Sequence, residues 1–135
     1  MIIRQATKKD IARIYSMVLT ATRRGRILRR SRPEIAKSIH HFWVAEQQGK
    51  IIACCALEVY NKKLAEVRSL AVEVDHQRKG IATALLQRCI RKAKKQKIYE
   101  ILAITDRESL FRRCGFSEQL HGQKALFLRP NGRLA

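Results

Sequence analysis

The chain has 135 residues, of which 46% are hydrophobic and 30% are charged, and this balance excludes an intrinsically disordered protein. The length predicts a single domain over residues 1–135, large enough to bury a core. No apolar run approaches the roughly 20 residues needed to cross a bilayer. The opening segment MIIRQATKKD also lacks the apolar region and cleavage site of a signal peptide. We therefore expect a cytoplasmic protein that does not bind membranes.

The chain is strongly basic, with 29 Lys and Arg against 11 Asp and Glu and a formal net charge of +18. Residues 23–32 contain six Arg and no acid, and residues 78–97 contain eight Lys or Arg and no acid. A positive field attracts nucleotide cofactors, acidic substrates, acidic protein partners and nucleic acid. The charge does not distinguish among these, and a solvated surface that only favours solubility would carry the same residues.

The four cysteines indicate buried free thiols. Cys54 and Cys55 are adjacent within an apolar run, and Cys89 and Cys114 are far apart in the chain. There is no C-x-x-C pair, and the four His do not fall at zinc-ligand spacing. We therefore expect no bound metal.

The first part of the chain predicts one strand and two helices. Residues 1–6 (MIIRQA) predict a strand, and residues 7–21 predict a helix with Thr7 as N-cap and Asp10 three residues later. Its apolar residues fall at helical spacing. A basic connection follows. A second helix is predicted over residues 31–41, opened by Ser31 or Arg32 before Pro33, a residue favoured at the first helical position.

The pattern then changes to strands. Residues 42–47 and 50–60 predict a hairpin around the turn QQGK, and residues 64–74 predict a third strand. An amphipathic helix is predicted over residues 80–96, a buried strand over 98–104, a short helix ending at Gly115, and a last strand over 124–130 (KALFLRP).

The predicted order is therefore β-α-α-β-β-β-α-β-α-β, which indicates an α/β (α+β) fold. The crossover from the third strand of the group through the helix to residues 98–104 predicts parallel pairing. The preceding strands are joined by short turns and should be antiparallel. We expect a twisted mixed sheet with helices on both faces.

The turn between residues 77 and 82 (QRKGIA) predicts an anion-binding site. It follows a strand and opens a helix, whose first N–H groups have no partners within the helix. Such a helix start suits a phosphate or pyrophosphate, and Gly80 and Ala82 would let a ligand approach the backbone. A similar spacing arises by chance in roughly one chain in ten of this length, so its position between strand and helix carries the prediction.

The chain resembles GNAT-type (Gcn5-related) N-acetyltransferases over about residues 2–129. The matching stretches are SLAVEVDHQRKGIATALL (69–86) and LFRRCGF (110–116). The resemblance implies the GNAT fold and acetyl-CoA as the acetyl donor. It implies that backbone groups hold the pyrophosphate and pair with the pantetheine arm of coenzyme A, and that the two parallel strands splay apart beside it. The implied cofactor-binding residues are Leu70, Ala71, Val72, Gln77, Arg78, Lys79, Gly80, Ile81, Ala82 and Thr83.

The resemblance also implies catalytic roles. Glu66 stands where several family members place a general base, and strand alternation predicts that it points to the same side as Leu70. Alternatively, Glu66 is a solvated carboxylate or an ion-pair partner of Arg68. Many relatives carry a Tyr that protonates the leaving thiolate at the position of Phe111, so this acid is absent here. Tyr60, Tyr99 or water remain open for that step.

A closer resemblance concerns the acetyl acceptor. The stretches RGRILRRSRPEI (24–35), KLAEVRSLAV (63–72) and LFRRCGF resemble the acetyltransferase domain of bacterial N-acetylglutamate synthases, the first enzymes of arginine biosynthesis. This implies glutamate or a similar amino acid as acceptor, with Arg29 and Lys63 as substrate-binding residues. Arg68 replaces a small residue and would fill or recharge the acceptor pocket.

Two features depart from that group, and two other functions stay open. The C-terminal segment is shorter and offers only Gln123 and Lys124, and we expect no amino-acid-kinase domain within these 135 residues. The alternatives are a GNAT enzyme that acetylates a protein or ribosomal amine, and a non-catalytic nucleic-acid-binding domain. Only 6% of the residues are aromatic, and this low content disfavours the last. Since relatives often dimerise, a homodimer is a possible assembly.

Overall fold

A five-stranded sheet organises the fold in the computed structural model, which describes residues 1–24 and 29–132. Its strands are β1 (Ile2–Gln5), β2 (Phe42–Gln47), β3 (Lys50–Val59), β4 (Leu64–Val72) and β5 (Glu100–Ala103). They lie in the order β1-β2-β3-β4-β5, with β4 and β5 parallel and all other neighbours antiparallel. The predicted mixed sheet and parallel crossover are confirmed.

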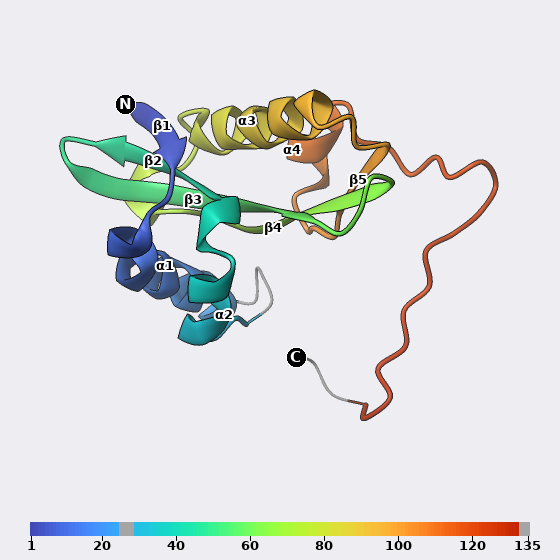
Figure 1. Ribbon diagram of the computed structural model, residues 1–135, viewed down its shortest axis with the longest axis horizontal. Helices are drawn as coiled ribbons and strands as arrows, with labels where there is room; N and C mark the ends of the chain where they lie inside the picture. Colours follow the sequence, from blue (N-terminus) through green and yellow to red (C-terminus); the bar gives the residue numbers. More distant parts are fainter. Residues whose placement is uncertain (25–28, 133–135) are drawn as a thin grey trace.

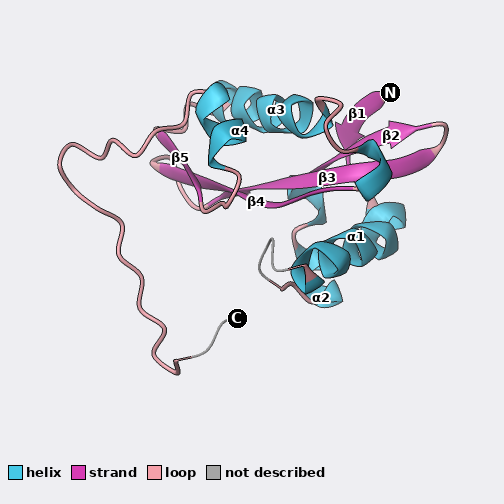
Figure 2. Ribbon diagram, turned by 180° about the vertical axis from the view of Figure 1, so that it is seen from behind, coloured by secondary structure: helices cyan, strands magenta, loops and turns pink. Residues whose placement is uncertain are grey.

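Helices cover both faces of this sheet (Figures 1 and 2). One face carries α1 (Ile11–Arg23) and α2 (Arg32–Lys37), and the other carries α3 (Ile81–Lys95) and α4 (Glu108–Arg113). Short 3-10 turns are found at Lys8–Asp10, Ile39–His41 and Val74–His76. The α/β fold class expected from the sequence is thus confirmed.

Reciprocal side-chain caps begin the first two helical segments. The Thr7 amide donates to Asp10 Oδ2 at 2.8 Å, and the Glu34 amide donates to Ser31 Oγ at 3.2 Å. The Asp10 carboxylate also accepts from Arg4 Nη1 at 2.8 Å. These bonds satisfy amide donors that a helix start leaves free, so both N-termini lie where the capping residues predict them.

The core consists of two apolar clusters on opposite faces of the central strands. The cluster under α3 includes Cys55 and Cys89, whose sulfur atoms lie 3.7 Å apart, and the cluster under α1 and α2 includes Cys54. Both clusters therefore contain thiols. All four cysteines are free, and Cys114 alone of them is half-buried. Burial raises the pKa of the Cys54 thiol to about 12 and keeps it protonated, as expected for a packing residue.

The predicted last strand is not formed, which corrects the expected order of elements. Residues 124–130 pair with no other strand in the described chain, and all seven are exposed. The segment runs away from the end of the sheet (Figures 1 and 2). A strand is stable only when a neighbour satisfies its backbone groups, and within one copy of this chain residues 124–130 have no such neighbour.

Candidate active site

The site begins where β4 and β5 stop pairing. Their ladder runs from Leu64 opposite Glu100 to Val67 opposite Ala103 and then ends. In β4 the next residues include Ser69, which has a φ of 57°. Opposite it, the two steps of β3 from Cys54 to Ala56 are matched by three steps of β4 from Arg68 to Ala71. This is a β-bulge, and the strands separate directly beside it.

The bulge corrects one expectation about side-chain direction. Leu70 packs in the cluster under α3, whereas Ala71 packs in the cluster under α1 and α2. Glu66 shares its face with Arg68, because both lie opposite alternate residues of β3. The prediction that Glu66 and Leu70 point to the same side is therefore wrong. The extra residue of the bulge reverses the alternation after Arg68, so Glu66 faces the side of α1 and α2.

A cavity of about 230 Å³ fills the space where the two strands separate. Three walls form it: the end of β4 with the turn after it, the segment after β5, and the inner side of α1. The lining residues from these walls include Glu66–Val74 and Gln77, Ile104–Arg107 with Phe111, and Arg13, Met17, Thr20, Ala21 and Arg24. The predicted residues Glu66, Arg68, Leu70, Ala71 and Val72 thus meet at one cavity.

The charged lining of this cavity consists of four arginines and three acids, Glu66, Glu73 and Asp106. Arg13 is neutralised by Glu73, whose Oε2 lies 2.5 Å from Arg13 Nη2. Arg24, Arg68 and Arg107 also line the cavity, and none of these three has an ion-pair partner among residues 1–24 and 29–132. An anionic group that entered the cavity would meet these unpaired guanidinium groups.

Glu66 is held by a tyrosine that the sequence left open. Tyr60 Oη donates to Glu66 Oε1 at 2.6 Å. Burial, followed by this hydrogen bond, raises the pKa of Tyr60 above its ordinary value of 10.0. Tyr60 therefore stays a hydrogen-bond donor at neutral pH. Tyr99 lies at the far end of β5, where its amide bonds to Lys62, and it is 73% exposed.

Arg30 is a residue of this region that the sequence analysis missed. It is only 5% exposed. Its Nη1 lies 3.3 Å from Ser69 Oγ in the bulge, and its Nη2 lies 3.0 Å from Glu58 Oε1. The guanidinium also lies 5.5 Å from the ring centre of Phe42. The signal available in the sequence was the pair Arg29-Arg30 itself, which did not tell which of the two points inward.

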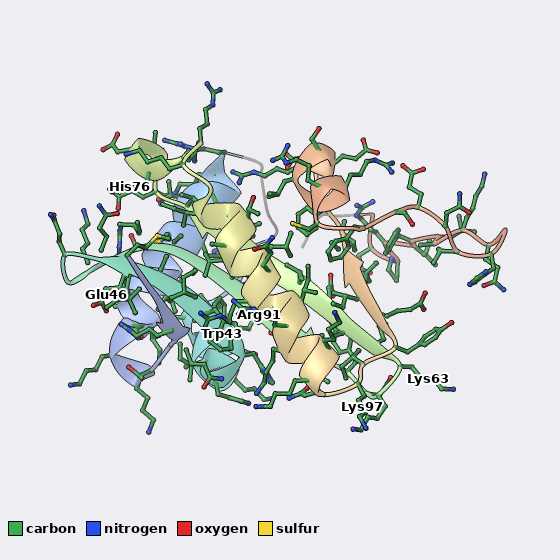
Figure 3. The ribbon with its side chains drawn as sticks, turned by 90° about the horizontal axis from the view of Figure 1, so that it is seen from above. Trp43, Glu46, Lys63, His76, Arg91 and Lys97 are labelled. Carbon is green, nitrogen blue, oxygen red and sulfur yellow. The ribbon has the colours of Figure 1, made fainter. Side chains whose placement is uncertain are left out.

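Two predicted substrate residues lie away from the cavity. Arg29 is exposed and does not line it. Lys63 is exposed in the turn before β4, six residues before Ser69, which is about 20 Å along an extended strand. Figure 3 shows Lys63 beside Lys97 after the end of α3, while His76, just before the start of α3, lies at the opposite end. The structure therefore brings Arg30, and neither Arg29 nor Lys63, to the bulge.

The start of α3 lies next to the cavity and presents free amides. Gly80 is its N-cap with a φ of 80°, and Arg78 has a φ of 64°. The first helical bond runs from the Ala84 amide to the Gly80 carbonyl, so the preceding amides remain available to a ligand. The Gln77 side chain donates to the Val72 carbonyl at 3.1 Å and ties this turn to the end of β4. Lys79 and Gly80 are exposed, whereas Ile81 is buried and anchors the helix; Ala82 and Thr83 are half-buried.

Phe111 closes the far side of the cavity. It is 5% exposed and packs edge-on against Phe116 with ring centres 5.1 Å apart. This supports the interpretation of Phe111 as a packing residue.

Among the described residues no group of three or more His, Cys, Asp and Glu could hold a metal ion. None of the described helices is both long and apolar enough to cross a membrane.

Comparison with known proteins gives the family. Residues 38–118 match the model of the acetyltransferase (GNAT) domain. An uncharacterized N-acetyltransferase of Chlorobaculum tepidum is 33% identical over 116 residues, which cover 86% of this chain and 75% of that protein. The chain therefore belongs to the GNAT family and is an N-acetyltransferase.

Other relatives carry more specific names. The amino-acid acetyltransferase of Pseudomonas putida is 30% identical over 86% of this chain. The structure of N-acetylglutamate synthase from Neisseria gonorrhoeae, complexed with coenzyme A and N-acetyl-glutamate, has a TM-score of 0.81 at 30% identity and matches 86% of this chain. A Mycobacterium tuberculosis protein in complex with CoA has a TM-score of 0.82 at 28% identity, covering 88% of this chain and 73% of that one. The chain spans only 27% and 28% of the length of the first two proteins.

Proposed function

We propose that this protein transfers the acetyl group of acetyl-CoA to the α-amine of glutamate or a similar acidic amino acid. The observation that carries this proposal is the cavity beside the β4 bulge, where Glu66 lies among the unpaired Arg24, Arg68 and Arg107. A base next to unpaired arginines suits an acceptor that has one amine and carboxylate groups. The names of the amino-acid acetyltransferase relatives support the same acceptor class.

In this proposal the donor binds along β4 and the start of α3. The amides of Arg78, Lys79, Gly80, Ile81, Ala82 and Thr83 hold the pyrophosphate of coenzyme A at the positive end of the helix. The pantetheine arm lies against the backbone of Leu70, Ala71 and Val72, as an added strand would. The separation of β4 and β5 supports this placement, because it leaves that edge of β4 unpaired.

The transfer itself needs a free amine and a stabilised oxyanion. Glu66 accepts a proton from the acceptor ammonium, directly or through water, and the amine nitrogen then attacks the thioester carbon. A backbone N–H near Leu70 or Val72 donates to the oxyanion of the tetrahedral intermediate. The C–S bond breaks, and the thiolate of coenzyme A leaves with a proton from solvent or from the former ammonium group. Tyr60 keeps Glu66 in position for this step.

Arginines set the acceptor preference. Arg68 lies on the same face of β4 as Glu66, so it pairs with an acceptor carboxylate while the amine faces Glu66. Arg29 and Lys63 are proposed as substrate residues only from the family resemblance, and they could act only on parts of an acceptor that extend beyond the cavity. Membership of an acetyltransferase family disfavours the non-catalytic nucleic-acid-binding alternative.

An amine screen tests the proposal. Purified protein is incubated with acetyl-CoA and glutamate, aspartate, glutamine, leucine or short peptides, and release of coenzyme A thiol is followed. Turnover that requires an acidic amino acid and is lost in Glu66→Gln is the expected result. Turnover of peptides without turnover of free amino acids would favour the second candidate, acetylation of a protein amine, for which the +18 charge would act in docking.

A further inference from the structure

Arg30 is a buried arginine that joins four separate parts of the chain beside the candidate active site. Its Nη1 donates to Ser69 Oγ in the bulge at 3.3 Å. Its Nη2 donates to Glu58 Oε1 in β3 at 3.0 Å and to Ser38 Oγ, directly after α2, at 3.5 Å. The guanidinium also lies 5.5 Å from the ring centre of Phe42, the first residue of β2. One side chain thus ties the bulge of β4 to three other elements.

Stability alone does not explain this buried ion pair. Taking two charges out of water costs about as much free energy as their attraction returns, and an apolar pair of similar volume is often equally stable. Arg30 Nε is also buried and has no hydrogen-bond partner among the described residues, which adds to the cost. A buried pair with such costs suits a role in fixing one definite geometry.

The geometry in question is that of the proposed base. Glu58 lies directly opposite Glu66 in the β3–β4 ladder, so the two carboxylates are neighbours on one face of the sheet, and like charges in such a pair repel each other. Arg30 holds the Glu58 carboxylate, whereas Tyr60 donates to Glu66 Oε1 at 2.6 Å. Each carboxylate therefore has a partner of its own.

An unpaired Glu58 would compete with the base for its partner. Tyr60 comes two residues after Glu58. The pKa of Tyr60 is raised by burial first, then by the hydrogen bond to Glu66, and the charge of Glu58 is among the smaller causes. A Glu58 carboxylate freed from Arg30 would accept from the Tyr60 phenol or repel Glu66, and either change would move the base.

We propose that Arg30 is a positioning residue for acetyl transfer. It fixes the bulge through Ser69. By holding Glu58, it leaves the Tyr60 phenol to Glu66. Arg30 does not line the cavity, so it acts through these residues and not on the reacting atoms. This inference rests on the proposed role of Glu66 as the base.

Apolar replacement of the pair separates positioning from stability. In Arg30→Met/Glu58→Met the urea midpoint should stay close to that of the wild type, because no charge is left buried. With glutamate as acceptor, kcat should still fall by about tenfold, because the bulge has lost its tie, while the Kd for acetyl-CoA stays unchanged. Glu108→Met/Arg112→Met removes an exposed Arg–Glu pair from α4 and should leave kcat unchanged.

Arg30→Met alone should be the slower enzyme. It also frees Glu58 to compete for Tyr60, so kcat of the folded protein should fall by about 100-fold. Adding Glu58→Met should then recover part of the activity. Wild-type kcat in Arg30→Met/Glu58→Met, or no recovery from Arg30→Met on adding Glu58→Met, would overturn the proposal.

Arg30→Lys gives a variant that keeps the charge beside Glu58. Its single ammonium lacks the fork that reaches both Glu58 and Ser69, so kcat should fall by about 3- to 10-fold in a stably folded protein. An undiminished kcat would again contradict a positioning role.

Two further measurements separate this inference from the proposed function. If Glu66→Gln is inactive while the Arg30 variants are fully active, the base stands and the positioning role fails; if Glu66→Gln keeps full activity, both fail. Hydrogen exchange needs no acceptor: the amides of residues 66–72 should exchange more than about tenfold faster in Arg30→Met/Glu58→Met than in the wild type. Equal exchange in the two proteins would show that Arg30 does not fix the bulge.

Discussion

Tyr60 Oη lies 2.6 Å from Glu66 Oε1 and donates a hydrogen bond to it. Glu66 is therefore oriented by a side chain from the end of β3, the strand next to its own. Because burial and the neighbouring carboxylate raise the pKa of Tyr60, the phenol remains protonated in the pH range of most assays. This contact gives the first test of the proposed base.

Tyr60→Phe should lower kcat by about 3- to 30-fold, because Glu66 loses the bond that positions it, while the Kd for acetyl-CoA stays unchanged. Steady-state kinetics and titration calorimetry measure the two quantities. Tyr99→Phe is the matched control, since Tyr99 lies 73% exposed at the far end of β5. An equal loss of kcat in both variants would contradict the positioning role.

Gly80→Glu should abolish binding of acetyl-CoA by at least about 100-fold while the protein stays folded. A side chain at Gly80 meets no atom within 4 Å, so the fold tolerates it apart from about 1–2 kcal/mol of left-handed strain. The added carboxylate lies at the amides proposed to hold the pyrophosphate and repels it. The shift of Tm on adding acetyl-CoA measures binding.

The control for that variant is Gly49→Glu. Gly49 has a φ of 74°, close to that of Gly80, and space around it is equally open, but it lies in the β2–β3 turn. Its strain is comparable, but Gly49 does not line the candidate active-site cavity and is not among the residues whose amides are proposed to hold the pyrophosphate. Normal acetyl-CoA binding by Gly80→Glu would refute the placement of the donor.

Arg30→Met should destabilise the fold by about 3 kcal/mol, because it leaves Glu58 without its buried partner. Arg29→Met, one residue earlier and exposed, should change the free energy of unfolding by less than about 0.5 kcal/mol. Urea unfolding measures both. The Arg29→Met protein also tests the family resemblance, since a substrate role for Arg29 predicts a raised KM for the acceptor.

Stability should also fall in acid through Asp10. The hydrogen bond from Arg4 lowers the pKa of Asp10 below its ordinary value of 3.8. A carboxyl with a lowered folded-state pKa stabilises the fold above its unfolded pKa, and this contribution is lost as the pH falls through the folded pKa. Asp10→Asn should therefore cost about 1–2 kcal/mol at pH 7 and progressively less below about pH 4.

Urea unfolding at several pH values measures this contribution. Asp75→Asn is the control, because Asp75 is exposed and forms no ion pair within the described residues. A constant difference between the wild type and Asp10→Asn across the whole range would show that the Arg4 contact does not act through ionisation.

The sequence predicted well the features that depend on local pattern. The capped helix starts at Thr7 and Ser31, the hairpin turn at Gln48 and Gly49, and the start of α3 at Gly80 all follow from residues a few positions apart. Such features need no knowledge of the remaining chain. Glu66, Arg68 and the end of β4 line one cavity, and the sequence could place them together because all of them belong to the same strand.

Features that depend on distant partners could not be predicted. The bulge at Ser69 depends on how β4 meets β3, so strand alternation placed Leu70 on the wrong face relative to Glu66. Arg30 was not chosen over Arg29 because its partner Glu58 is 28 residues away. The segment KALFLRP has the composition of a strand, but composition does not supply the paired neighbour that a strand needs.

Because of the bulge at Ser69, the number of residues in this part of β4 matters for function. Deleting one residue there would restore unbroken alternation and remove the reason for β4 to bend away from β5. The chain would then gain regular sheet and lose the opening that holds Glu66 and its arginines. Substitutions in this stretch would be tolerated far better than a change of length, so sequences of related enzymes should vary here in residue type while keeping the count between Glu66 and Gly80.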